Sequence, residues 1–114
     1  MEKFSVGDVV FVHFPFSDLK KSKLRPAVVI ASVQHDDWIL CQITSKSYAD
    51  NASIELRGAD FKEGSLKITS YIHPGKIFTV HESIINKKAG VLKDDIHALL
   101  IERIVGLISP QPQS

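Results

Sequence analysis

The sequence has few residues of the kinds that form disulfides or bind metals. Its 114 residues include one cysteine, one methionine and one tryptophan. A single cysteine excludes an internal disulfide, and the position of Cys41 in the apolar run 38–43 predicts a buried side chain in a reducing compartment. The five histidines are scattered, with no i, i+4 pair and no cysteine at zinc spacing. We therefore expect neither a metal site nor a cofactor.

The sequence also lacks an excess of charge and a long apolar run. It has 14 basic and 13 acidic residues, so its formal net charge is +1 at pH 7. A nucleic acid would have to be held by a local basic patch rather than by the field of the whole protein. No segment has the pattern of a signal peptide or the length of a membrane span. We expect a soluble cytoplasmic protein with a single domain over 1–114, in which 109–114 form a flexible tail.

β-branched and aromatic residues predict a mainly β chain. The expected strands are 9–16, 27–31, 38–44, 53–56 and 77–80, with Gly58, Gly64, Pro74 and Gly75 in the connections. Alternation places Val10 and Val12 on one face of the first strand and Phe11 and His13 on the other. The connection between 27–31 and 38–44 is too short for a crossover helix. These two strands should therefore form an antiparallel hairpin.

The apolar spacing changes to three and four residues from position 94 to about 108. This period predicts an amphipathic helix whose apolar stripe is formed by Ile96, Leu99, Leu100, Ile104 and Leu107. Asp94 and Asp95 suit the positive end of such a helix. Several short strands followed by one helix predict a small curled β-barrel with a C-terminal helix packed over it.

The pair Arg25-Pro26 and the run Thr44-Ser45-Lys46 mark the candidate site. In an antiparallel hairpin the start of one strand lies beside the end of the next, so Arg25 and Thr44 should meet at one sheet edge. A guanidinium matches a phosphate, and a hydroxyl can donate to a phosphoryl oxygen. The side chains expected to flank this phosphodiester site are Lys20, Lys21, Lys23, Ser45 and Lys46.

Each of these residues also has an ordinary structural interpretation. Arg25 could be a surface arginine paired with Asp18 or Asp36. Thr44 could be a common strand residue, and the lysines of the loop 17–24 could form a solvated charge run. The sequence alone leaves both interpretations open.

Two histidines and one aromatic residue are further candidates. His73 and His81 bracket a predicted strand and could act as acid and base in a ribonuclease of another design, or be half-buried residues at the strand ends. His73 could also line an RNA groove together with Ser70 and Lys76. Phe16 could stack on an unpaired base or belong to the core.

Four strings in a fixed order carry a resemblance to a known family. They are GDVVFVHFPF, LRPAVVI, QITSK and SYIHPGKIFTV, followed by the closing apolar helix. With these strings the chain resembles, over nearly its whole length, the MazF/PemK family of toxin endoribonucleases. His13 stands where relatives often carry an acidic residue, which affects a detail of the groove and not the catalytic pair.

The resemblance implies both a fold and an activity. It implies an SH3-like barrel of the MazF/CcdB type, a homodimer, a cognate antitoxin partner and cleavage of single-stranded RNA such as mRNA. It also implies that Arg25 and Thr44 are the catalytic positions. RNA carries its own nucleophile, so the ribose 2′-hydroxyl can attack the adjacent phosphate without a metal and leave a 2′,3′-cyclic phosphate and a 5′-hydroxyl. The alternatives are a non-catalytic, CcdB-like toxin that inhibits a protein such as DNA gyrase, and an inactive nucleic-acid-binding barrel.

Overall fold

The computed structural model of the chain describes residues 3–14, 23–46 and 52–110. Most of the predicted tail 109–114 lies outside these ranges. The strands are β1 (Asp8–Phe14), β2 (Lys23–Ser32), β3 (Asp37–Thr44), β4 (Ile54–Leu56), β5 (Phe61–Gly64), β6 (Ser70–His81) and β7 (Ile85–Leu92). Three 3-10 helices, η1 (Gln34–Asp36), η2 (Gly58–Asp60) and η3 (Glu82–Ile84), precede β3, β5 and β7, and the helix α1 (Asp94–Ile108) follows β7.

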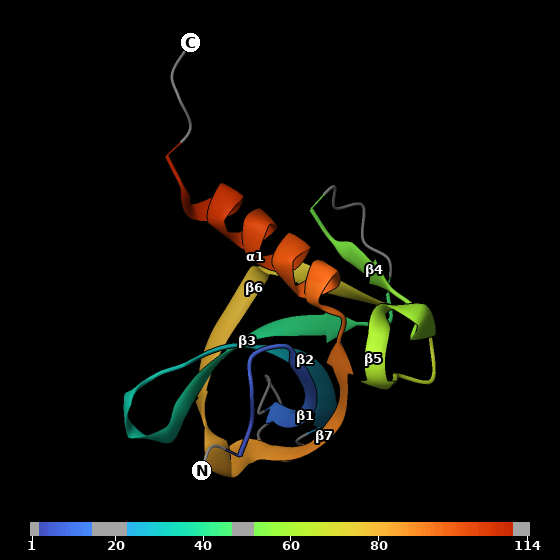
Figure 1. The fold of residues 1–114 in the computed structure, drawn as a ribbon. Helices are drawn as coiled ribbons and strands as arrows, with labels where there is room; N and C mark the ends of the chain where they lie inside the picture. Colours follow the sequence, from blue (N-terminus) through green and yellow to red (C-terminus); the bar gives the residue numbers. More distant parts are fainter. Residues whose placement is uncertain (1–2, 15–22, 47–51, 111–114) are drawn as a thin grey trace.

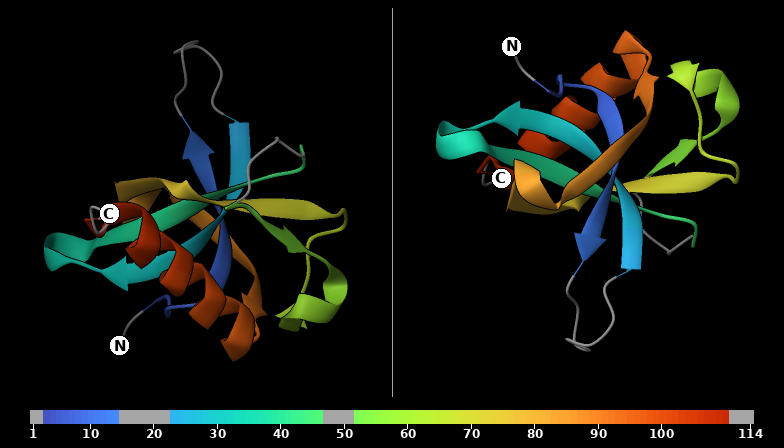
Figure 2. Two further views of the ribbon diagram at one scale, coloured as in Figure 1. Left: turned by 90° about the horizontal axis from the view of Figure 1, so that it is seen from above. Right: turned by 90° about the horizontal axis from the view of Figure 1, so that it is seen from below.

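The seven strands that the structure describes form one antiparallel sheet in the order β4-β6-β3-β2-β1-β7-β5. The sheet curls into a half-barrel, and α1 crosses the outside of the curl (Figure 1). Views from above and below show β1 running beside β2, with the short strands β4 and β5 at one side of the molecule (Figure 2). The prediction of a mainly β fold with a C-terminal helix packed on a curled sheet is confirmed.

Each face of the curled sheet carries its own hydrophobic cluster, because side chains alternate along the strands. The cluster between the sheet and α1 contains Val9, Val28, Cys41, Ile43, Ile54, Leu56, Phe61, Ile72, Leu92, Leu100 and Ile104. The cluster on the opposite face contains Val10, Val12, Ala27, Val29, Trp38, Leu40 and Ile85. The prediction that Val10 and Val12 share one face of the sheet is therefore confirmed.

The helix α1 begins with two carboxylates, as predicted. The backbone N–H of Ile96 donates to Asp95 Oδ1 at 3.0 Å, and Lys62 Nζ lies 2.9 Å from Asp94 Oδ1. Leu107 was predicted to belong to the buried stripe, but it is 53% exposed. It lies over Gly75, which has no side chain to cover it. No described helix is both long and apolar enough to cross a membrane.

The strand β6 corrects two sequence expectations. It was predicted as 77–80 alone, with Pro74 and Gly75 in a connection, yet it runs unbroken from Ser70 to His81. The register between β3 and β6 shifts between Cys41 and Ile43, which leaves Pro74 without a ladder partner on β3. Proline is tolerated at such an irregularity because no ladder needs its missing N–H. The strands β5 and β7 were not predicted, since FKEG and INKKAGVL have little apolar alternation.

Candidate functional site

A groove of about 960 Å³ lies where β2 begins, β3 ends and the β5–β6 connection faces β7. Its lining residues are Phe11, Lys23, Arg25, Pro26, Gln42, Ile43, Thr44, Ser45, Lys46, Ser65, Leu66, Lys67, Ile68, Ser70, Lys87, Lys88 and Ala89. The β1–β2–β3 part of the sheet forms one wall, and the Ser65–Ile68 connection forms another. The groove is open enough to receive an extended chain.

The hairpin brings the predicted pair to this groove. On β2 and β3 the Cα partners are Ala27 with Gln42 and Val28 with Cys41. Arg25 and Thr44 both line the groove, and the same register continued two residues beyond the Ala27–Gln42 pair would set them opposite each other. The structure thus brings both residues to one groove, and their direct contact stays a prediction.

The environment of Thr44 orients its hydroxyl. Thr44 is 9% exposed, and its Oγ1 accepts a hydrogen bond from the backbone N–H of Lys46 at 3.2 Å. An oxygen that already accepts at one lone pair keeps its O–H to donate elsewhere. The turn that begins at Ser45 thus fixes a hydroxyl donor at the groove wall.

The groove is far more basic than the chain as a whole. The cationic side chains among its lining residues are Lys23, Arg25, Lys46, Lys67, Lys87 and Lys88. No aspartate or glutamate is among the described residues that line it. A chain with a formal net charge of +1 therefore gathers a surface on which a polyanion can bind.

The structure brings several of the other predicted RNA-binding residues to the groove. Lys23, Ser45, Lys46 and Ser70 line it. Ser70 is 3% exposed, and its hydroxyl donates to the carbonyl of Ile68 at 3.1 Å, so it braces the wall. The predictions for Phe16, Lys20 and Lys21 fall outside the described residues.

The suggested arginine partners can be placed only in part. Asp18 also falls outside the described residues. Asp36 lies in η1, at the opposite end of β2 from Arg25. The structure therefore does not bring Asp36 to Arg25.

His73, Lys76 and His81 do not line the groove. The expectation that His73 lines it is not met, because its side chain is 3% exposed and packed within the sheet. Lys76 is exposed, but it lies further along β6 than the groove extends. His73 and His81 are separated by roughly 26 Å of extended strand, so they do not form an acid–base pair.

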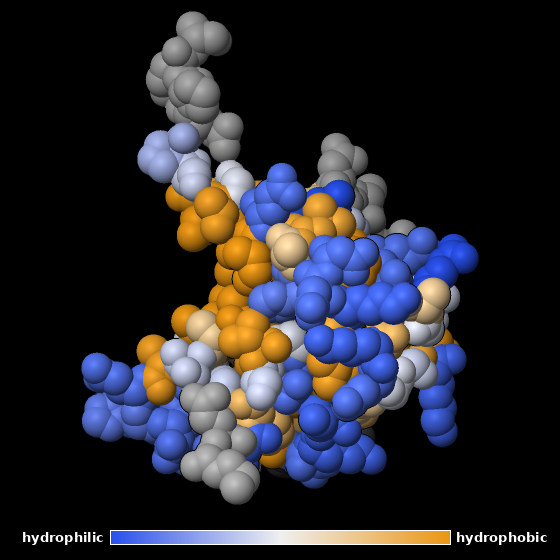
Figure 3. Space-filling view, in the orientation of Figure 1, coloured by the Kyte–Doolittle hydropathy of each residue, from blue (hydrophilic) through white to orange (hydrophobic). Residues whose placement is uncertain are grey.

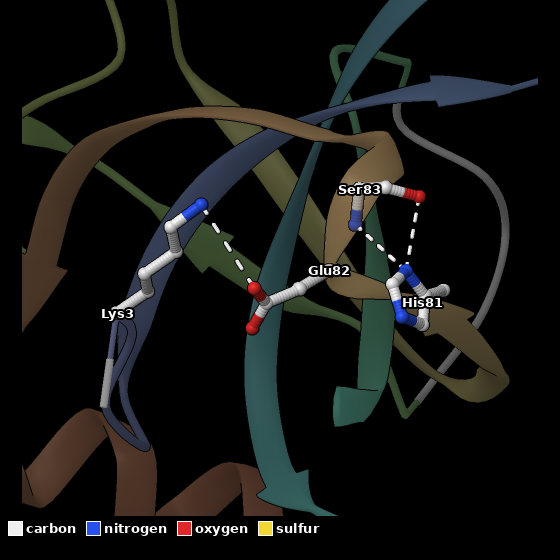
Figure 4. A network of polar contacts seen from close by, with 4 residues as sticks. All are labelled: Lys3, His81, Glu82 and Ser83. Atoms are coloured by element: carbon white, nitrogen blue, oxygen red, sulfur yellow. Dashed lines mark hydrogen bonds and ion pairs between the residues drawn. The ribbon is translucent and has the colours of Figure 1, made fainter. Parts of the chain in front are cut away.

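His81 has a local structural role instead. Its Nδ1 accepts a hydrogen bond from the backbone N–H of Ser83 at 3.1 Å and lies 3.0 Å from Ser83 Oγ. The His81 side chain thereby caps η3. Beside this cap, Lys3 Nζ lies 3.9 Å from Glu82 Oε1 (Figure 4). The contacts of His81 are those of a strand-end residue.

Cys41 precedes the groove residue Gln42 in the sequence but is not available as a nucleophile. It is fully buried, and its Sγ–H donates to the carbonyl of His73 at 2.9 Å. Burial raises the pKa of the Cys41 thiol to about 12. The reactive thiolate form is therefore scarce near neutral pH. Among the described residues, no three His, Cys, Asp or Glu side chains are grouped as a metal site would require.

Several groove residues were missed by sequence reasoning. They are Phe11, Gln42, Ser65, Lys67, Lys87 and Lys88. The basic pair Lys87-Lys88 was a visible signal. However, β7 pairs with β1 across more than seventy residues of sequence, and no local pattern predicts that pairing.

Comparisons with known proteins agree with the architecture. A family model described as the PemK-like, MazF-like toxin of type II toxin-antitoxin systems matches residues 5–107. The chain is similar to MazF from Deinococcus radiodurans, with a TM-score of 0.74 and 15% identity over 95% of this chain and 98% of that one. No curated protein is significantly similar to the chain.

Two mycobacterial structures show the same likeness. An endoribonuclease in complex with its cognate antitoxin from a mycobacterial species has a TM-score of 0.73 and 12% identity, covering 94% of this chain and 97% of that one. The Mycobacterium tuberculosis toxin MazF-mt6 has a TM-score of 0.69 and 13% identity, covering 87% and 93%. At this identity the likeness establishes the fold.

Proposed function

The chain belongs to the PemK-like, MazF-like toxin family of type II toxin-antitoxin systems, and on that premise we propose that it is a metal-independent endoribonuclease acting in the cytoplasm. Its substrate is single-stranded RNA, including mRNA, which it cleaves selectively at short sequence motifs. The observation that carries the proposal is that Arg25 and Thr44 line one groove whose described residues include six cationic side chains and no carboxylate.

The reaction uses the nucleophile that RNA contains. The 2′-oxygen bonds to phosphorus, the bond from phosphorus to the 5′-oxygen breaks, the 2′-hydroxyl loses a proton and the leaving oxygen gains one. Negative charge accumulates on the non-bridging oxygens in the transition state, where a preorganised donor contributes about 3–4 kcal/mol. In our mechanism the Arg25 guanidinium is this donor.

Thr44 helps to position the phosphoryl group in the same mechanism. Its Oγ1 accepts a hydrogen bond from the Lys46 N–H, which leaves its own O–H to donate to the phosphoryl group. Arginine remains protonated near neutral pH and is a poor base. The proton of the 2′-hydroxyl is therefore taken by another group.

Two partners complete the proposal. The first is a second copy of the chain, which would lengthen the RNA groove in a homodimer. The second is a cognate antitoxin, a partly disordered segment that folds across the same groove and covers its lysines. The mycobacterial endoribonuclease complexed with its antitoxin and the MazE–MazF structures from Deinococcus radiodurans support such a partner.

The catalytic assignment is tested by incubating purified protein with a long single-stranded RNA in EDTA. The wild-type chain should produce 5′-hydroxyl ends, and Arg25→Ala should cut roughly 100- to 1,000-fold more slowly because the donor to the transition state is gone. Arg25→Lys keeps the charge but loses the planar fork, so it should recover only part of the rate.

Arg57→Ala is the matched control, because Arg57 is an exposed arginine that pairs with Glu55 and does not line the groove. This variant should cut like the wild-type chain. Full activity of Arg25→Ala would overturn the mechanism. RNA left intact by the wild-type chain would instead favour a non-catalytic inhibitor or an inactive RNA-binding barrel.

A further inference from the structure

Phe11 is an aromatic residue of the groove that the proposed chemistry does not use. Its neighbours Val10 and Val12 point to the face opposite α1 and are fully buried there. Phe11 points the other way, is half-buried, lines the groove and belongs to neither hydrophobic cluster. Its ring therefore faces the groove rather than either hydrophobic cluster.

The pairing of β1 places Phe11 next to the catalytic strand. Its Cα partners are Pro26 on β2 and Lys87 on β7, and Pro26 directly follows Arg25. Adjacent strands are about 4.8 Å apart, so Pro26 and Lys87 lie roughly 10 Å from each other with Phe11 between them. Figure 2 shows β1 flanked by β2 in this part of the sheet.

Lys87 is associated with the Phe11 ring. Its Nζ lies 5.9 Å from the ring centroid, in a cation–π contact. An exposed contact of this kind is weak, whereas a base stacked on an aromatic side chain is held more strongly. A base can thus replace the ammonium over the ring, and the freed ammonium can reach a phosphate of the same strand.

We propose that Phe11 is the platform on which a base of the RNA bound in the groove stacks, and that Lys87 turns from the ring to a neighbouring phosphate when that base arrives. This inference rests on the proposed function, since it names how the same groove holds its single-stranded substrate. Stacking selects for an unpaired base because only an unstacked base offers its face. The pair would therefore contribute to the preference for single strands as well as to affinity.

The test measures binding without cleavage. The first probe is a 2′-O-methyl RNA oligonucleotide pool of mixed sequence, which lacks the nucleophilic hydroxyl, and the second is a sugar–phosphate strand of the same length without bases. Phe11→Leu and Phe11→Met should bind the pool roughly 5- to 100-fold more weakly than the wild-type chain, the loss that removal of one stacking ring causes. Both variants should bind the abasic strand like the wild-type chain. Phe11→Tyr keeps the ring and should bind both probes normally.

Lys87 is tested by the salt dependence of the same binding. Each phosphate contact to a single strand contributes about 0.7 to the slope of log K against log salt concentration. Lys87→Met should lower that slope by about 0.7 with the pool. Lys93→Met, at an exposed lysine that does not line the groove, is the matched control and should leave the slope unchanged.

The outcomes separate this inference from the proposed function. Equal losses with both probes in Phe11→Leu and Phe11→Met, or no loss with either, would overturn the stacking platform. A groove that binds oligoglutamate but neither nucleic-acid probe would be a peptide site, and would overturn both proposals. If the wild-type chain binds in a base-dependent manner but cuts no RNA, the endoribonuclease proposal fails and the platform stands.

Discussion

At the scale of single residues, the groove depends on two side chains separated by eighteen others in sequence. Arg25 and Thr44 come to one groove because the β2–β3 hairpin keeps one register from Val29 and Leu40 to Ala27 and Gln42, two residues short of the pair. The hydrogen bond from the Lys46 N–H then fixes the Thr44 oxygen. A change of one residue in this register would turn one of the two side chains to the opposite sheet face.

His97 is a second residue whose environment has a measurable consequence. It lies in the first turns of α1 against Gly7, and its Nε2 is buried without a hydrogen-bond partner among the described residues. Burial lowers the pKa of His97 below its ordinary value of 6.5, and the nearby carboxylate of Asp94 opposes this effect. The folded protein therefore prefers neutral His97.

This preference predicts a pH dependence of stability. Because the unfolded chain binds the proton more readily, the contribution of neutral His97 is complete above pH 6.5 and is lost as the pH falls toward the lowered pKa. Urea unfolding between pH 7.5 and about pH 5 should show stability falling less steeply in His97→Gln than in the wild-type chain. Identical slopes for His97→Gln and the wild-type chain would contradict this account.

At the scale of elements, the strand β5 depends on a close approach to β7. Gly90 faces β5, where a Cβ would lie 2.5 Å from the carbonyl oxygen of Glu63 and 2.9 Å from Phe61 Cδ2. Gly64 ends β5 with φ at +61°, a conformation that favours glycine. This contact matters for function because β5 leads directly into the Ser65–Ile68 wall of the groove.

Gly90→Ala should therefore lower the free energy of unfolding by about 1–3 kcal/mol, the usual cost of overpacking. It should also weaken RNA binding, since the added methyl group moves β5 and the groove wall that follows. Gly106→Ala is the opposite control, because Gly106 lies in α1 with no atom near its missing Cβ. That variant should gain roughly 0.5–1 kcal/mol from helix propensity. Urea unfolding measures both, and equal stability of Gly90→Ala and the wild-type chain would show that β5 can shift at no cost.

At the scale of the whole molecule, the surface carries apolar side chains that the fold does not cover. Val105, Leu107 and Ile108 are 50%, 53% and 73% exposed at the C-terminal end of α1. Hydrophobic surface gathers there and continues along the left side of the molecule (Figure 3). An exposed patch of this kind is typical of an interaction site and supports the proposed homodimer.

Light scattering at micromolar concentration should then give twice the chain mass of 12.7 kDa. Ile108→Glu should shift the protein toward the monomer, because a charge in the patch would be buried on pairing. A monomeric wild-type chain would refute the homodimer.

The sequence by itself determined those features that depend on nearby residues. The β2–β3 hairpin, the helix from Asp94 and the burial of Cys41 follow from period, loop length and apolar context. The hairpin also accounts for the presence of Arg25 and Thr44 in one groove. The order of the motifs also identified the family. These signals are local, so a linear reading of the chain can find them.

Only the tertiary structure decided what the rest of the groove is made of. Phe11, Lys67 and Lys87 meet because β1 pairs with β7 and the β5–β6 connection folds back against them, and such pairings leave no periodic trace in sequence. The same long-range packing buried His73 at a register shift that Pro74 tolerates. The lysines gather in a basic groove although the chain has almost no net charge. The curl of the sheet, and not the composition, determines which lysines lie together.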